Sequence, residues 1–522
     1  MEIVTEPLEE RPVAGSENSA RRYGRGCLLF LTAIFLTVLP VGLYWNTIWT
    51  SFGLRDDYGV VREAREEPIQ IVKFCGSHAR PVYGWLLEKS FKTIDHVRDL
   101  SWARLVGSVL VGVLSACTCV ILVQMFSWSL LTAACVSAML TLVPTAQVIV
   151  SWGILWPYAV AALLSMGAFV VAEMSFRLPA KSRLKQLGLY VLANAMVIVS
   201  AWTYQSCSLF YLVFVAVCAV QRGGWMKQPS RLRLIQHLLV LGGALLMAYV
   251  LIRVAFAMDL LPMSKRIAFE SDFPGKLVWF AENSLSNALA VFVLHDLQGR
   301  TDPWYHIAVA ATGLLLVTGG LLVGRRRGWR EALVWFGAFA ILTIGAYAIN
   351  MVASERWSSY RTLYPLAGVV LIFAAAATEV LGEAIPFLKR GRFGLGLTVI
   401  VVAAYMARMQ AYELIAVPQS KEYRLVLQES AKLDRSRDQR VYVITPTPSI
   451  APVKLMCTDE FGSLSTDSDW VPKEIMKLHF YETKPEQPAC RSLDHMVSGE
   501  KPPPPGLYDV VVDLRGLRGM TK

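Results

Sequence analysis

Long apolar runs alternate with polar segments along the whole chain. Eleven runs, most of roughly 18–24 residues, are long enough to cross a bilayer as helices. They cover about residues 27–48, 103–124, 128–149, 155–176, 187–205, 206–221, 237–257, 306–323, 332–352, 363–384 and 393–414. The pattern therefore predicts an α-helical polytopic membrane protein with about 11 transmembrane helices.

The basic residues between the runs support this count. Clusters of Lys and Arg follow the fourth, sixth, eighth and tenth runs, so all four lie on the side of the N-terminus, as the positive-inside bias predicts. The clusters are Arg177, Lys181, Arg183 and Lys185; Arg222, Lys227, Arg231 and Arg233; Arg325, Arg326, Arg327 and Arg330; and Lys389, Arg390 and Arg392. The fifth and sixth runs abut without a polar linker. Either the chain turns sharply near Gln205 and Ser206, or one of these runs is re-entrant.

The polar segments divide the rest of the chain. Residues 1–26 are expected to form a cytoplasmic tail ahead of an uncleaved signal anchor. The membrane domain covers residues 27–415, with outer loops at 49–102 and 258–305. The remaining residues, 416–522, predict a small extracytoplasmic α/β domain with a helix over 421–433, strands over 440–445 and 508–514, and a Pro-rich turn at 502–505.

Composition agrees with a membrane protein. Hydrophobic residues make up 54% of the 522 residues, charged residues only 17%, and the mean hydropathy is +0.44. These values exclude an ordinary cytosolic enzyme, a secreted disulfide scaffold and a disordered chain. The net charge is 51 − 40 = +11, but the basic residues lie in short clusters between apolar runs. The expected partner is therefore the lipid bilayer and not nucleic acid.

The cysteines predict at most one disulfide. Six of the nine cysteines lie in apolar runs and are expected to pack as small apolar side chains. Cys457 and Cys490 form the only pair in the polar C-terminal part, and are disulfide candidates if that part lies in an oxidising compartment. The chain has no Cys/His spacing typical of a structural zinc site.

The first outer loop carries the most informative residues. Asp56 and Asp57 follow the first run by about eight residues, close to the bilayer surface. A carboxylate there can accept the proton of an acceptor hydroxyl as its oxygen attacks a sugar's anomeric carbon. Alternatively, the aspartates cap the helix expected over residues 58–67, which Pro68 ends. Since adjacent residues cannot point the same way, one can cap while the other reacts.

Three further polar residues are candidates for substrate binding. Arg80, in the same loop after His78, either holds a phosphate or sugar hydroxyl through its fork of donors or is an ordinary exposed loop arginine. Tyr204 and Gln205 lie at the outer end of the fifth run. Polar residues at that depth line a cavity or tie helices together.

Arginines on the outer side are a second set of candidates. Arg356 and Arg361 lie in a short outer loop, against the positive-inside trend, and are therefore candidates for binding an anionic ligand. Glu355 is expected to pair with one of them. Arg253 and Arg300 share the outer side and complete the set.

With these residues, the chain resembles the GT-C class of membrane glycosyltransferases. The resemblance rests on an N-terminal anchor, the acidic pair in RDDY (55–58), many spans and a trailing soluble domain. The later ARP, the Tyr204-Gln205 pair and the SERWSSYR loop (354–361) are similar to bacterial Gtr-type glucosyltransferases that decorate surface polysaccharides. The tail segment DEFGSLSTDSDWVP (459–472) also resembles relatives of that group, but suggests no role.

The resemblance implies an inverting transfer from a polyprenyl-phosphate-linked sugar, with glucose as the expected sugar, to a glycan or glycolipid acceptor. Asp56 or Asp57 would be the base, and outer arginines such as Arg356 and Arg361 would hold the phosphate. A divalent metal, Mg²⁺ or Mn²⁺, is a possible cofactor. The implied location is the bacterial inner membrane, with the C-terminal domain in the periplasm.

A transporter or flippase for a lipid-linked sugar is the alternative from another class. Transporters often have internal repeats and Gly/Pro-broken helices in matching halves, and neither is evident here. A membrane acyltransferase is a third option, but His237, the only histidine near the cytoplasmic end of a run, stands alone. The chain has no P-loop, GxGxxG, GxSxG or HExxH motif, so the usual signs of ATP, dinucleotide, serine-hydrolase and zinc-protease chemistry are missing.

Overall fold

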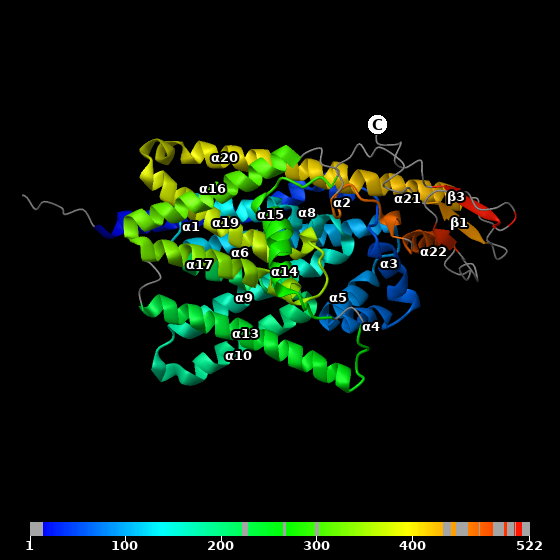
Figure 1. The fold of residues 1–522 in the computed structure, drawn as a ribbon, viewed down its shortest axis with the longest axis horizontal. Helices are drawn as coiled ribbons and strands as arrows, with labels where there is room; N and C mark the ends of the chain where they lie inside the picture. Colours follow the sequence, from blue (N-terminus) through cyan, green and yellow to red (C-terminus); the bar gives the residue numbers. More distant parts are fainter. Residues whose placement is uncertain are drawn as a thin grey trace, which may run out of the picture.

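The structure is a computed structural model that describes residues 14–221, 228–264, 268–297, 302–431, 440–444, 458–468, 470–483, 495–497, 506 and 508–513. Long helices lie side by side in a bundle, and shorter helices and a small domain gather at one end of it, which we call the loop side (Figure 1). The bundle helices are α1 (Ala14–Leu43), α6 (Leu100–Gln124), α7 (Leu130–Leu142), α8 (Pro144–Ser151), α9 (Trp156–Arg177), α10 (Arg183–Thr203), α11 (Gln205–Ser208), α12 (Tyr211–Val220), α13 (Gln228–Ala257), α16 (Asp302–Arg327), α17 (Trp329–Ala346), α19 (Tyr364–Ala384) and α20 (Pro386–Met409). The shorter helices are α2 (Trp45–Trp49), α3 (Asp56–Glu66), α4 (Gln70–Ser77), α5 (Pro81–Phe91), α14 (Phe273–Trp279), α15 (Ser286–Leu289), α18 (Ala348–Val352), α21 (Val417–Ser430) and α22 (Val471–Thr483).

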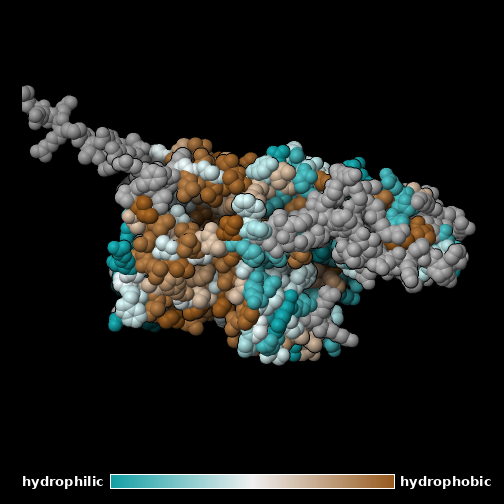
Figure 2. Space-filling view, turned by 45° about the horizontal axis from the view of Figure 1, so that its top comes forward, coloured by the Kyte–Doolittle hydropathy of each residue, from teal (hydrophilic) through white to brown (hydrophobic). Residues whose placement is uncertain are grey.

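The surface agrees with a membrane-embedded bundle. Figure 2 shows apolar side chains over the part of the molecule where Figure 1 has the long helices, and hydrophilic side chains over the loop side. Within the described residues, nine helices are long and apolar enough to cross a membrane. A tenth span results if α7 and α8, which are bent by 54° at Pro144, are counted as one. The predicted fold class is therefore confirmed: this is a multi-pass helical membrane protein.

The number of spans is lower than the eleven predicted because the sixth run is short. All eleven runs are helical, but α12 has only 10 residues, about 15 Å against a hydrocarbon core of about 30 Å. The backbone is extended at Tyr204, between α10 and α11. Before this break Ser200 donates to Ala161 O of α9, and after it the backbone oxygen of Ser208 accepts from Ser165 further along α9. The chain therefore reverses at Tyr204, the sharp turn that was one of the two alternatives.

The C-terminal part is joined to the bundle by continuous helix. A π-helical stretch (Gln410–Ala416) connects α20 to α21 without a break. Beyond α21, the strands β1 (Val441–Ile444), β2 (His495–Val497) and β3 (Val510–Asp513) form a parallel sheet of order β2-β1-β3, with Val441 opposite both His495 and Val510. The helix α22 packs against α3 and α21. These elements form the small α/β domain that the sequence predicts, whereas Cys457 and Cys490 lie outside the described residues.

A buried arginine fixes the start of the first loop. Arg104 of α6 is fully buried and donates to Ile48 O (3.1 Å), Thr50 O (2.7 Å) and Phe52 O (2.9 Å). Because α2 ends at Trp49, its last carbonyl groups have no helical partner. The guanidinium satisfies one of them, Ile48 O, together with Thr50 O and Phe52 O just beyond the helix, and so holds the segment that leads to Asp56.

Replacing this arginine should destabilise the protein. In Arg104→Met three buried carbonyl oxygens lose a charged donor, and we expect the free energy of unfolding to fall by about 3 kcal/mol or more. Thermal melting in detergent measures the change as a lower apparent melting temperature. Arg98→Met is the matched control, since the Arg98 side chain is 75% exposed. Equal melting temperatures for both variants would contradict the role of Arg104.

Candidate functional site

The two adjacent aspartates at the start of α3 have different surroundings. Asp57 is fully buried and accepts hydrogen bonds from the backbone N–H groups of Leu54 (2.9 Å), Ile154 (3.0 Å) and Gly153 (3.4 Å). It therefore joins the first loop to the short 3-10 helix Gly153–Leu155, which precedes α9. Burial raises the pKa of Asp57 to about 7, although these N–H groups and the charge of Arg104 act in the opposite direction.

Asp56 is half-buried and points elsewhere. It follows Arg55, which has the left-handed φ of +43°. Burial is the main cause of the raised pKa of the Tyr83 hydroxyl, and the negative charge of Asp56 raises it further. Asp56 therefore lies within electrostatic range of Tyr83 of α5, whereas Asp57 is bonded to the bundle.

Arg80 of the first loop meets Tyr204 and Gln205, although Gln205 lies 125 positions further along the sequence. The Arg80 Nε donates to Gln205 Oε1 (2.8 Å), and Gln205 Nε2 donates to Ala79 O (3.0 Å). The Arg80 guanidinium carbon lies 4.7 Å from the centre of the Tyr204 ring, which stacks on Tyr158 with 3.5 Å between ring centres. The helix break at Tyr204 allows this contact because it turns Gln205 toward the first loop.

Arg80 keeps its charge uncompensated. None of the ion pairs formed within the described parts of the chain involves Arg80, and its hydrogen-bond acceptor, Gln205, is a neutral amide. The other groups that act on its charge are the tyrosines Tyr158, Tyr204 and Tyr83 and the like charge of Arg361. Such an arginine can bind an anion without first losing a carboxylate partner.

Arg361 is the second arginine whose charge acts on the Tyr83 hydroxyl. It belongs to the 3-10 turn Tyr360–Thr362, just before α19. Its guanidinium carbon lies 5.0 Å from the Trp152 ring centre and 4.8 Å from that of Trp357. The charges of Arg80 and Arg361 both lower the pKa of Tyr83, against burial. The charges of Asp56, Arg80 and Arg361 thus all act on Tyr83, and we call these three residues the loop-side site.

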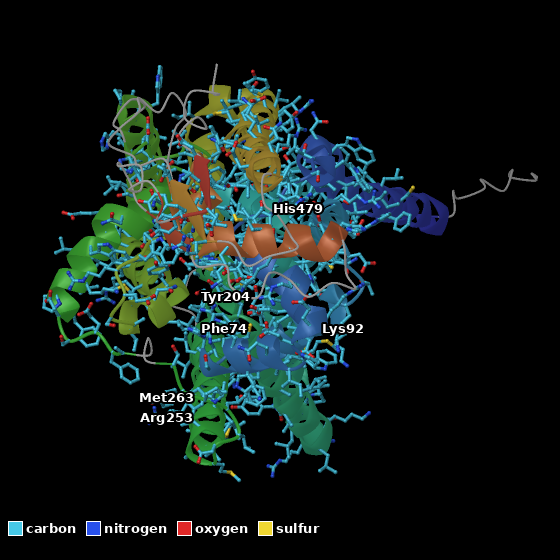
Figure 3. The ribbon with its side chains drawn as sticks, turned by 90° about the vertical axis from the view of Figure 1, so that its right-hand side faces the viewer. Phe74, Lys92, Tyr204, Arg253, Met263 and His479 are labelled. Atoms are coloured by element: carbon cyan, nitrogen blue, oxygen red, sulfur yellow. The ribbon has the colours of Figure 1, made fainter. Side chains whose placement is uncertain are left out.

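Other predicted residues lie apart from this site. Arg356 is paired with Asp272 (2.9 Å) and Glu270 (3.3 Å), and its hydrogen bond lowers the pKa of Asp272. The backbone oxygen of Glu355 accepts from Lys276 Nζ (2.6 Å) in the same cluster. Arg253 is exposed and lies with Met263 away from Tyr204 (Figure 3). Arg300 lies outside the described residues.

The turn of residues 458–463, here called the tail turn, has no role that the sequence predicts. Thr458 and Phe461 exchange two backbone hydrogen bonds across it. Asp459 Oδ2 accepts from the backbone N–H of Tyr360 (2.8 Å), and Glu460 Oε1 lies 3.8 Å from Arg361 Nε. The only signal in the sequence was the resemblance of segment 459–472 to relatives of Gtr-type enzymes, because the contacts join positions about 100 residues apart.

The described residues offer no ligand set for the Mg²⁺ or Mn²⁺ considered above. No group of three or more His, Cys, Asp or Glu side chains among them is arranged to hold a metal ion. We therefore derive no step through a metal.

Fold and site together define a multi-pass helical membrane protein with a charged, aromatic-walled site at one end of the bundle. No family model matches the chain, and no curated protein matches it in sequence. Among solved structures it is similar to the archaeal oligosaccharyltransferase AglB from Archaeoglobus fulgidus, in complex with an inhibitory peptide and a dolichol-phosphate, with a TM-score of 0.43, 14% identity and 81% of this chain covered. The chain spans 62% of the length of that AglB chain.

Two structures of ArnT from Cupriavidus metallidurans are also similar. The apo state has a TM-score of 0.40 at 13% identity, covering 85% of this chain and 84% of ArnT. The form bound to undecaprenyl phosphate has a TM-score of 0.38 at 13% identity, covering 84% of each chain.

The burial of Asp57 predicts a pH effect on stability. Its pKa is about 7 in the folded protein and near the ordinary value of 3.8 when unfolded. Between these values the folded state holds a proton that the unfolded state releases, so stability falls as the pH rises from about 4 to 7, by at most about 4 kcal/mol. Asp57→Asn should flatten the slope of melting temperature against pH in this window. Asp259→Asn, at an exposed position, should keep the wild-type slope, and equal slopes in the two variants would contradict the assignment.

Proposed function

We propose that the protein is a GT-C-like membrane glycosyltransferase that moves a sugar from a polyprenyl-phosphate carrier to an acceptor hydroxyl, with Asp56 as the general base. The observation that carries the proposal is one half-buried carboxylate, Asp56, at the start of α3, together with two arginines held against aromatic rings, Arg80 on Tyr204 and Arg361 between Trp152 and Trp357. The charges of all three act on Tyr83. Asp57 is excluded from the role of base in this proposal because three backbone N–H groups occupy its carboxylate.

The chemistry needs one base and positive charge. The acceptor oxygen attacks the anomeric carbon from the face opposite the phosphate, its proton passes to the Asp56 carboxylate, and a new C–O bond forms. The bond between the anomeric carbon and the phosphate oxygen breaks, and its electron pair stays on the departing phosphate. The configuration at the anomeric carbon inverts. A phosphate leaves as a stable anion, so Arg80 and Arg361 suffice to stabilise it without a general acid.

The depth of the site suits a lipid-linked donor. Tyr204 directly follows the span Arg183–Thr203, and Arg361 lies just before the span Tyr364–Ala384. The arginines therefore lie at the level where helices leave the membrane. A polyprenyl chain could remain in the bilayer while its phosphate reaches Arg80, and a water-soluble acceptor could approach from the loop side.

The finer assignments rest on the resemblance to Gtr-type enzymes. On that basis we propose glucose as the sugar, a glycan or glycolipid as the acceptor, and a bacterial inner membrane with the loop side and the C-terminal domain in the periplasm. Phosphate binding by Arg356, Arg253 and Arg300 stays a prediction.

Asp56→Asn should abolish sugar transfer and leave the melting temperature unchanged, because a carboxamide has the shape of the base without its basicity. The measurement is sugar transfer by purified protein in nanodiscs from a panel of polyprenyl-phosphate sugars, glucose first, with candidate acceptors. Asp259→Asn is the control, an exposed aspartate with a left-handed φ of +54° that Asn also adopts. Full transfer by Asp56→Asn would rule out Asp56 as the general base. Sugar-lipid translocation without transfer would instead favour the flippase.

Arg80→Ala should raise the KM for the donor by about tenfold or more, because the lost guanidinium is not paired with a carboxylate and its full charge is available to the donor's phosphate. Arg356→Ala should have a smaller effect because Glu270 and Asp272 already neutralise that charge. Steady-state kinetics with the donor varied at fixed acceptor measures both. A larger effect at Arg356 would move the phosphate site away from Arg80.

A further inference from the structure

The tail turn brings a buried carboxylate to the loop-side site. Glu460 is fully buried, its Oε1 accepts from Ser359 Oγ (3.1 Å), and the same oxygen lies 3.8 Å from Arg361 Nε. Its Oε2 is buried without a hydrogen-bond donor in the described structure. A buried carboxylate in this state is costly unless a positive charge lies close by. Burial and the neighbouring Asp459 raise the pKa of Glu460 well above its ordinary value, and the charges of Arg361 and Arg55 act against that rise.

The surroundings of Arg361 limit where its guanidinium can go. The Trp152 and Trp357 rings lie 5.0 Å and 4.8 Å from the guanidinium carbon, and Glu460 is the third neighbour. The Arg361 side chain is 18% exposed, so part of it remains open to the site. The two rings restrain the guanidinium, and the Glu460 carboxylate, 3.8 Å from Nε, adds an electrostatic attraction toward one side of it.

Glu460 is not needed to hold the tail turn in place. Gly462 N donates to Leu414 O, and Gln419 Nε2 donates to Ser463 O (2.8 Å). Glu422 accepts from the backbone N–H groups of Ser465 (3.0 Å) and Thr466 (2.8 Å). With these bonds and that of Asp459 to Tyr360, the turn remains docked if Glu460 loses its charge.

We infer that Glu460 is a positioning residue of the loop-side site: it orients the Arg361 guanidinium toward the donor's phosphate, and so makes the C-terminal domain a working part of the site. The inference rests on the proposed function. Full burial prevents Glu460 from touching the substrate, and it therefore acts through Arg361.

Glu460→Gln tests this because the amide keeps the size and the acceptor for Ser359 but cannot carry a negative charge beside Arg361. We expect kcat to fall by about tenfold or more, since a misplaced guanidinium no longer meets the departing phosphate. Glu460→Asp, which keeps the charge on a shorter side chain, should retain more activity than Glu460→Gln. The matched control is Glu474→Gln, which removes the 3.0 Å ion pair between α22 and Arg62 of α3 in the same domain. It should leave kcat unchanged.

Binding of polyprenyl phosphate, measured by thermal stabilisation in detergent, provides a readout that does not depend on transfer. If Glu460 merely offset the charge of Arg361, Glu460→Gln would bind the lipid phosphate more tightly. The positioning role predicts weaker binding, by about tenfold, with Glu474→Gln unchanged. Tighter or equal binding, or equal activity of Glu460→Gln and Glu474→Gln, would overturn the inference. Absence of transfer in wild type with every donor would count against the proposed function alone, because the binding comparison still decides the role of Glu460.

Discussion

The hydrogen bonds of Asp57 are the constraint on which the loop-side site depends. One buried carboxylate accepts N–H groups from its own loop and from the turn before α9, and so joins two parts of the chain almost 100 residues apart. Successive helical residues differ by about 100° in direction. Fixing Asp57 toward the bundle therefore gives Asp56 a different direction. Arg104 supports the same segment from the other side by satisfying the carbonyl groups at the end of α2.

Breaks in helices at the end of the bundle supply the rest of the site. The backbone is extended at Trp152, directly after α8, and again at Tyr204, directly after α10. Both of these helix ends are therefore marked by an aromatic residue. Irregular backbone at membrane depth persists only where protein buries it or where it lines a cavity. Here the two breaks bring Trp152 against Arg361 and Tyr204 against Arg80, so that the irregular backbone and the two cations of the site share the same location.

Local patterns in the sequence predict much of this arrangement. Hydropathy is a property of short segments, and the apolar runs therefore predict the helices. In the same way, polar residues at the end of an apolar run identify Tyr204 and Gln205 as candidates. Position along the chain cannot separate Arg361 from Arg356, since both lie in one short outer loop. Only folding places Arg356 against two carboxylates and Arg361 against two tryptophan rings. The role of Glu460 depends on a contact across about 100 residues, which no local pattern encodes.

The two arginines of the site are held by different chemistry, and this suggests a division of labour. Gln205 orients Arg80 through a neutral amide oxygen, which fixes the guanidinium without reducing its charge. The Glu460 carboxylate lies 3.8 Å from Arg361 Nε and offsets part of the charge of that arginine. The attraction for an incoming anion is therefore greater at Arg80. In the proposed reaction, a phosphate that binds first at Arg80 would meet in Arg361 a second donor, restrained by Trp152 and Trp357, for the negative charge that develops as the sugar leaves.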